Sequence, residues 1–454
     1  MNEVIEYMPY LILFVILSLT VYLFDQEFSS VIMVLLIGTL GLVNCSRAPI
    51  SGRKRSYMLL GIVSSVYIIS ALITSQNFIG NHAFLVPDAL QYTRWINLAR
   101  PDDNYWALIL DNYLGLLDKD TLHEVYVRVV CIFANNHLGH ASVLYLTLTH
   151  TIFGILAILS LYRALLLYYD DKKAFKYALV FALGSPFLFY STVIIRDIII
   201  AYFFMQGIEI VLQPYKSKNI IALLALVILA AGVRLFSGLF MLSFIAVYLT
   251  RRFEHTKIKM IIIPVFIILI AGVVAGGLVN ALIEQTQEQL EYYQEYDANS
   301  AASSGGLSIY LLALPTGIKE VALFFYSQFM PFPFYAHLST ASNFTEVYQG
   351  ITTIVYPIWW FYIFYMFFIL YVFKGKYKQL SISMNMFILL SFAYIFANTA
   401  QIDVRRMMHI YPFLFIMSLN CQNFLSKKME VRKVGKLLMG GYALLLIAYL
   451  VIKG

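Results

Sequence analysis

Residues 184–207 read GSPFLFYSTVIIRDIIIAYFFMQG, an apolar segment that carries Arg196 and Asp197 at its middle. A charge at the centre of a bilayer costs about 2.5–3.5 kcal/mol even on the mildest scale, so such groups face a partner or a water-filled cavity. The rest of the chain must therefore supply a partner or a water-filled cavity for the Arg196 guanidinium and the Asp197 carboxylate, which lie in a segment that otherwise favours lipid.

The composition predicts a membrane protein. Of the 454 residues, 61% are hydrophobic and only 13% are charged. Apolar runs of bilayer-spanning length recur from Tyr10 to Ile452, which predicts an all-α, polytopic integral membrane protein. The first run lacks a basic start and is typical of a spanning helix rather than a signal peptide. The three scattered cysteines indicate no disulfide framework.

The positive charges orient the predicted helices. The net charge is +7, and 21 of the 32 Lys and Arg residues lie in six short loops between apolar runs. This is the pattern of cytoplasmic loops in membrane proteins, so the excess charge does not indicate a nucleic-acid partner. The six loops cover residues 46–55, 170–176, 213–219, 250–259, 374–379 and 426–436.

With these loops inside, the sequence predicts a single transmembrane domain over 1–454, with about thirteen crossings. The N-terminus lies inside and the C-terminus outside. Two long extracytoplasmic loops are expected, at 76–141 and 284–350. The expected helices cover 8–25, 29–45, 57–75, 142–168, 177–195, 197–212, 220–233, 235–250, 260–283, 351–373, 380–398, 407–424 and 437–452.

Two of these regions are expected to be short hairpins. Tyr177 to Leu212 has 36 residues, roughly 54 Å as one helix, which is too long for a hydrocarbon core of about 30 Å. Ile220 to Thr250 has 31 residues and basic loops on both sides. If the basic loops beside each region lie in the cytoplasm, Arg196 and Arg234 lie at the outer turns of two hairpins. The helices of these hairpins are short, so the turns are expected to lie below the outer membrane surface.

Four arginines are predicted to lie at the same depth in the membrane, at its outer side. Arg405 and Arg406 lie in the outer turn ANTAQIDVRRMMHIYPF, and Arg196 and Arg234 lie in the two hairpins. Guanidinium forms bidentate contacts with phosphate and stays charged at any relevant pH, so the cluster suits a diphosphate. Alternatively, each arginine reaches the interface alone, or pairs with an acid such as Asp197 or Asp403.

Candidates for a base remain open. Asp88, followed by Tyr92 in VPDALQYTRW, can act as a general base or as a helix N-cap. His337 lies in the second long loop, and His409 lies one turn after the paired arginines. Either can accept a proton, or can simply pack. His137 and His140 have helical metal-ligand spacing, but no third ligand is evident, and the sequence predicts no metal and no other cofactor.

Three segments resemble the bacterial Wzy-type polymerases of O-antigen and capsule repeat units: YSTVIIRDIIIAYFFMQG, LLALVILAAGVRLFSGLFML and DVRRMMHIYPFLFIM. In the first, Arg196 and Gly207 enclose ten residues, which is similar to an Arg-x10-Gly pattern of this family and its ligase relatives. The many helices and two long external loops match the family's topology as well.

This resemblance implies a GT-C-like membrane glycosyltransferase in the bacterial inner membrane, with its active site facing the periplasm. Donor and acceptor would be undecaprenyl-diphosphate-linked oligosaccharides, and the growing chain would pass from its carrier to a new unit. Arg196, Arg234, Arg405 and Arg406 would bind the diphosphate, and Asp88 or His337 would be the base. Asp197, Tyr92, Asp403 and His409 would support them. A chain-length regulator and a flippase would be further partners.

Two other functions are compatible with the sequence. The early external acid Asp88 is also similar to that of GT-C enzymes with lipid-monophosphate sugar donors, in which the arginines would serve a single phosphate. A transporter of lipid-linked oligosaccharides is the third candidate. Such carriers place charges near the midplane between two related halves, whereas the charges here are predicted at outer turns.

Overall fold

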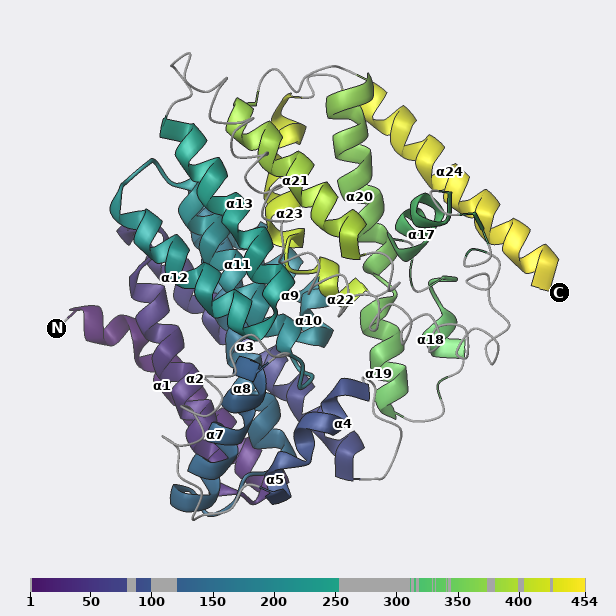
Figure 1. The fold of residues 1–454 in the computed structure, drawn as a ribbon. Helices are drawn as coiled ribbons and strands as arrows, with labels where there is room; N and C mark the ends of the chain where they lie inside the picture. Colours follow the sequence, from purple (N-terminus) through teal and green to yellow (C-terminus); the bar gives the residue numbers. More distant parts are fainter. Residues whose placement is uncertain are drawn as a thin grey trace, which may run out of the picture.

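The structure is a computed structural model, and every element in the part that it describes is helical (Figure 1). The described residues are 2–79, 87–98, 121–252, 311, 314–315, 318–328, 330, 332–339, 341, 344–373, 380–398, 404–424 and 428–453. The predicted crossing 260–283 and most of the second long loop therefore lie outside the described residues.

Seven described helices are long and apolar enough to cross a membrane, and three shorter apolar helices accompany them. These helices agree with the predicted class, an all-helical membrane protein. The seven candidate spans are Tyr7–Asp25, Phe28–Ser46, Ile50–Ser75, Val143–Leu165, Leu235–Arg252, Glu346–Tyr371 and Arg432–Val451.

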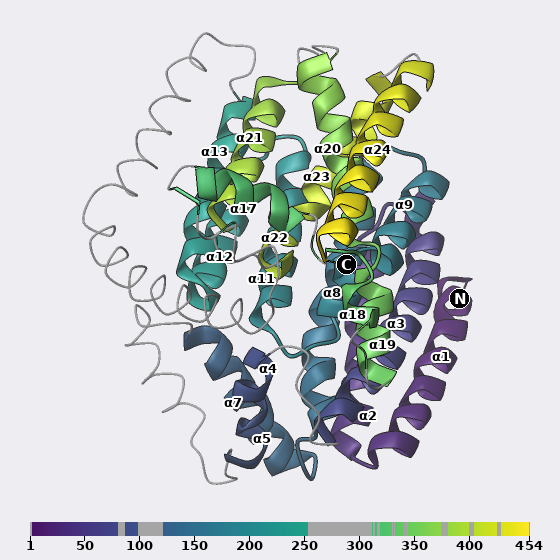
Figure 2. The ribbon, with the colours of Figure 1, turned by 90° about the vertical axis from the view of Figure 1, so that its right-hand side faces the viewer.

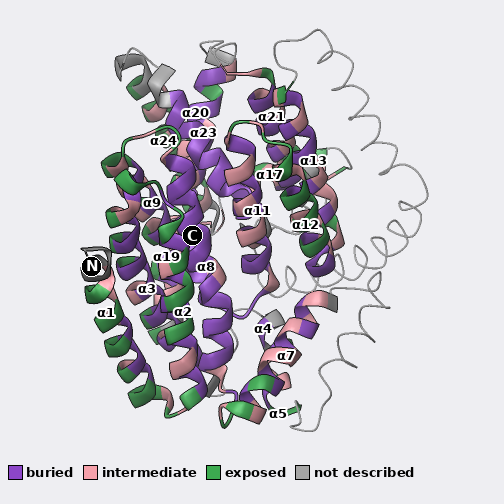
Figure 3. Ribbon diagram, turned by 90° about the vertical axis from the view of Figure 1, so that its left-hand side faces the viewer, coloured by how far each residue is buried: buried purple, intermediate pink, exposed green. Residues whose placement is uncertain are grey.

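Helix α8 forms the centre of the first half of the chain. It is nearly all buried and packs against α2, α3, α9 and α11, whereas exposed residues line the outward faces of α1 and α12 (Figure 3). Burial on the inside with apolar side chains outside is what a helix bundle in lipid requires. The bounds are α1 (Asn2–Asp25), α2 (Phe28–Ser46), α3 (Ile50–Ile79) and α8 (Val143–Leu165).

The predicted helix 177–195 is wrong, because the chain breaks twice there. Helix α9 (Asp171–Gly184) ends before Ser185, the five-residue α10 (Pro186–Tyr190) follows, and the next helix begins only at Arg196. Pro186 disfavours helix at the residue before it. The unwound stretch 191–195 is held by α3, since Thr74 Oγ1 donates to the Thr192 carbonyl at 2.6 Å.

The second predicted hairpin is confirmed. Helix α11 (Arg196–Leu212) leads into α12 (Lys218–Val233) and α13 (Leu235–Arg252), with Arg234 as the one extended residue between the last two. A Cβ on Gly238 would lie 2.5 Å from the backbone N and Cα of Ala231. Glycine therefore allows the two arms to touch right behind Arg234. Gly207 similarly admits the Phe244 ring between α11 and α13.

The second half of the chain packs beside this hairpin. Helix α21 contacts α13, α20 contacts α23, and α24 lies along the outside of α20 (Figure 2). Trp360 Nε1 donates to the Tyr411 hydroxyl at 2.6 Å and so ties α20 to α23. The bounds are α17 (Ile318–Gln328), α18 (Ala336–Ser339), α19 (Phe344–Thr353), α20 (Tyr356–Phe368), η1 (Ile369–Phe373), α21 (Ile382–Asn398), α22 (Val404–Met407), α23 (Tyr411–Phe424) and α24 (Lys428–Lys453).

Three short helices lie at the end of the bundle where α1 turns into α2, at the bottom of Figure 1. They are α4 (Pro87–Thr93), α5 (Trp95–Leu98) and α7 (Thr121–His137). Helix α7 contacts α12, and a Cβ on Gly232 would lie 3.0 Å from Leu122 Cδ2. The start of α7 therefore covers the tip of the α12–α13 hairpin.

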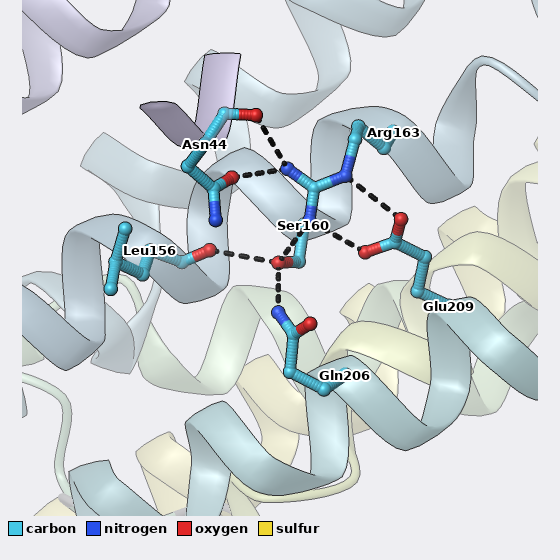
Figure 4. A network of polar contacts seen from close by, with 6 residues as sticks. All are labelled: Asn44, Leu156, Ser160, Arg163, Gln206 and Glu209. Carbon is cyan, nitrogen blue, oxygen red and sulfur yellow. Dashed lines mark hydrogen bonds and ion pairs between the residues drawn. The ribbon is translucent and has the colours of Figure 1, made fainter. Parts of the chain in front are cut away.

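A buried ion pair ties α2, α8 and α11 together (Figure 4). Arg163 donates from Nε and Nη2 to the two carboxylate oxygens of Glu209, at 2.8 Å each. Its Nη2 also donates to Ser160 Oγ at 2.9 Å, and its Nη1 donates to the Asn44 side chain and carbonyl. Arg163 thus has partners on both of its terminal nitrogens and on Nε, as buried ion pairs require.

Glu209→Gln is expected to destabilise the folded protein by about 3–5 kcal/mol, because removing one partner leaves Arg163 buried and uncompensated. Denaturant unfolding in detergent measures this loss. The double variant Arg163→Met, Glu209→Leu should regain most of it, since apolar replacement of both partners is often neutral. A double variant less stable than Glu209→Gln would contradict this explanation.

Candidate anion site at the hairpin tips

Asp197 is the centre of a buried charged cluster. Arg234 Nη1 donates to Asp197 Oδ1 at 2.9 Å, and Arg405 Nε lies 3.9 Å from Oδ2. His409 Nε2 lies 3.3 Å from Oδ1. Asp197 is 1% exposed and His409 is fully buried. Side chains that are 37 or more residues from Asp197 in sequence therefore meet at its carboxylate.

The ends of three helical segments bring these groups together. Asp197 lies in the first turn of α11, Arg234 lies between α12 and α13, and Arg405 lies in the short α22 between α21 and α23. Helix α12 has 16 residues, about 24 Å, which is less than the hydrocarbon thickness of about 30 Å. This arm is as short as the sequence predicts, and the depth of its tip in the membrane stays a prediction.

His409 is held between the cluster and α21. Its Nδ1 lies 2.7 Å from the Tyr394 hydroxyl, which in turn lies 3.4 Å from Ser237 Oγ. A neutral imidazole has one donor and one acceptor nitrogen. If Tyr394 donates to Nδ1, the neutral ring carries its proton on Nε2, the nitrogen that lies 3.3 Å from Asp197 Oδ1. This arrangement fixes the ring and makes His409 a structural support of the carboxylate.

The cluster carries more positive than negative charge. Two guanidiniums contact the Asp197 carboxylate, and Arg196 is its neighbour in sequence. Arg234 is 9% exposed, and among the described residues its buried Nη2 has no hydrogen-bond partner. A buried guanidinium N–H normally finds an acceptor. This Nη2, unpaired among the described residues, is therefore a candidate donor to an anion such as a phosphate.

A second polar pair lies beside the cluster. His123, in the first turn of α7, and His150, in the middle of α8, are fully buried, and their Nε2 atoms are 2.9 Å apart. Helix α7 is not one of the candidate spans. Burial lowers the pKa of His123 well below its usual value, the charges of His150 and Arg196 lower it further, and Asp197 raises it. His123 is therefore neutral at physiological pH.

The predicted site residues divide into three groups. Arg234, Arg405, Asp197 and His409 come together, and Arg196 begins α11 directly before Asp197. Tyr92 packs edge-on against His123, with ring centroids 4.4 Å apart. The backbones of Asp88 in α4, His337 in α18 and Arg406 in α22 are helical, but their side chains, and all of Asp403, lie outside what the structure describes.

Sequence reasoning missed His123 and His150. They are 27 residues apart on different helices, so no helical spacing connects them, and each alone is an ordinary histidine. Among the described residues no three His, Cys, Asp or Glu side chains gather as a metal site. The pair itself is joined by a direct hydrogen bond.

Comparisons of the chain with models of known protein families, with curated proteins and with solved structures found no match. The chemistry of the cluster is therefore the feature that indicates a function.

Proposed function

We propose that this chain is a membrane glycosyltransferase that polymerises lipid-diphosphate-linked oligosaccharides, as its resemblance to Wzy-type polymerases implies. In this proposal the protein has a GT-C-like arrangement with about thirteen crossings. It lies in a bacterial inner membrane with its site facing the periplasm. The observation that supports the proposal most is the buried convergence of Arg234 and Arg405 on one carboxylate, with Arg196 adjacent.

The arginines suit the leaving group of this reaction. The acceptor hydroxyl oxygen attacks the anomeric carbon of the donor chain, the bond from that carbon to the diphosphate oxygen breaks, and its electron pair leaves with the diphosphate. Donors that face this developing charge stabilise the transition state. Guanidinium groups can do so bidentately, and the orphan Nη2 of Arg234 is available for that purpose.

The purified protein in lipid nanodiscs is expected to convert lipid-diphosphate-linked repeat units into a ladder of longer chains. Released lipid diphosphate should appear in proportion to the bonds formed. Gel separation of the saccharides and mass spectrometry of the lipid product measure both. Transfer from a lipid-monophosphate sugar alone, or movement of lipid-linked units across liposomes without chain growth, would refute the proposal. In a deletion strain, surface polysaccharide should carry at most one repeat.

A further inference from the structure

The hydrogen bonds of the buried histidine pair assign its protons. His150 Nδ1 lies 2.9 Å from the carbonyl oxygen of Leu146. A carbonyl oxygen only accepts, so His150 carries its proton on Nδ1 and leaves Nε2 as an acceptor. The partner 2.9 Å away, His123 Nε2, must then donate. A neutral His123 therefore has an unprotonated Nδ1.

That nitrogen has an unused lone pair. His123 is fully buried, and among the described residues its Nδ1 has no hydrogen-bond partner. Most buried polar atoms in proteins have a hydrogen-bond partner, and a ligand or a reaction that uses the atom is one explanation for an exception. The hydrogen bond from His150 Nδ1 to the Leu146 carbonyl fixes the tautomer of His150. The hydrogen bond between the two Nε2 atoms then fixes the tautomer of His123. Contacts within α8 therefore determine that His123 Nδ1 is unprotonated.

The location of His123 connects it to the arginine cluster. Leu122, its neighbour, packs on Gly232 two residues before Arg234. The charges of Arg196 and Asp197 both act on the His123 ring. Tyr92 of α4 and Tyr126 of α7 flank the ring, and the Tyr126 hydroxyl donates to the Thr149 carbonyl at 2.8 Å. These contacts hold the imidazole next to the anion site.

We propose that His123 Nδ1 is the general base that takes the proton of the acceptor hydroxyl, with His150 as the residue that positions it. This inference rests on the proposed function. As the hydroxyl oxygen bonds to the anomeric carbon, its proton moves to Nδ1, and the electron pair of the broken bond leaves with the diphosphate. The imidazolium formed is stabilised by the nearby Asp197 charge and then gives its proton to the diphosphate or to water.

His123→Gln is expected to lower chain transfer by about 10²–10⁴-fold, the usual contribution of a general base. Binding of the lipid-diphosphate donor, measured by microscale thermophoresis in nanodiscs, should stay within threefold of wild type. His137→Gln, on the exposed face of the same helix, is the matched control and should transfer normally. His123→Asn provides a second variant in case the glutamine does not insert.

The pH profile separates a base from a packing residue. In wild type, kcat/KM should fall as the pH drops through the lowered pKa of His123, below the usual histidine range, and this acidic limb should vanish in both His123 variants. The charged or titratable groups that face the ring are His150, Arg196, Asp197, Tyr92 and Tyr126. An acidic limb that persists unchanged in the variants would overturn the assignment.

His150 tests the positioning role. In His150→Gln the side-chain oxygen can still accept from His123 Nε2, whereas His150→Leu frees the His123 proton to move to Nδ1. Transfer should therefore be at least tenfold lower in the leucine variant than in the glutamine variant, at equal donor binding. Equal transfer rates in the two His150 variants would overturn the positioning role of His150. Wild-type transfer rates in both His123 variants would overturn the assignment of His123 as the base and leave the polymerase proposal intact. A wild-type protein that forms no ladder of chains would refute the proposed function itself.

Discussion

Arg234→Ala is expected to lower chain transfer by about 10²–10³-fold, the effect of removing one preorganised donor to a developing negative charge. Arg234 is the cluster's extended tip residue, and its Nη2 is buried with no hydrogen-bond partner among the described residues. Binding of the lipid-diphosphate donor should weaken as well. Initial rates of ladder formation in nanodiscs, with donor binding measured on the same samples, give both values.

Arg234→Lys distinguishes charge from geometry. Lysine keeps the charge but lacks the planar fork that contacts a carboxylate and a phosphate together, so the variant should insert normally yet remain at least tenfold slower than wild type. Arg252→Ala, at the other end of α13 and exposed, is the control and should transfer normally. Wild-type rates in both Arg234 variants would show that this guanidinium only ties the hairpin to α11.

The hairpin that positions Arg234 was predictable from the sequence. Basic loops on both sides of residues 220–250 must lie on one face of the membrane, so the chain has to turn back between them, and the structure turns at Arg234. The break before α11 was predicted too late in the chain. The length of 177–212 indicated a turn, but Pro186 and the hydrogen bond from Thr74 unwind the backbone earlier.

The contacts of the site were less accessible to sequence reasoning. The sequence offered Asp197 as one possible acid partner of the arginines, but it did not show which side chains would meet there. The structure shows Asp197 in contact with Arg234, Arg405 and His409. Such pairing depends on how separate helices pack, and periodicity within one helix carries no information on it. For the same reason no pattern could connect His123 with His150, and the common depth of the arginines stays a prediction.

Asp197→Asn is expected to destabilise the anion-free protein by about 3–5 kcal/mol, because two buried guanidiniums lose the charge that compensates them. The same change should increase the stabilisation of the folded protein by added anions. A ligand that binds the folded state stabilises it by RT ln(1 + [L]/Kd), and the Kd for pyrophosphate should fall when the competing carboxylate is neutral. Thermal unfolding in detergent, with and without pyrophosphate, measures both effects on one sample.

The opposite signs of these two effects make the test specific to an anion site. A carboxylate that merely joined helices would lose stability on substitution without any gain in pyrophosphate response. Asp171→Asn breaks the partly exposed ion pair with Arg55 and serves as the control, with a stability change below about 1 kcal/mol and an unaltered response. If Asp197→Asn responds to pyrophosphate no more than wild type does, the cluster is a structural network and not an anion site.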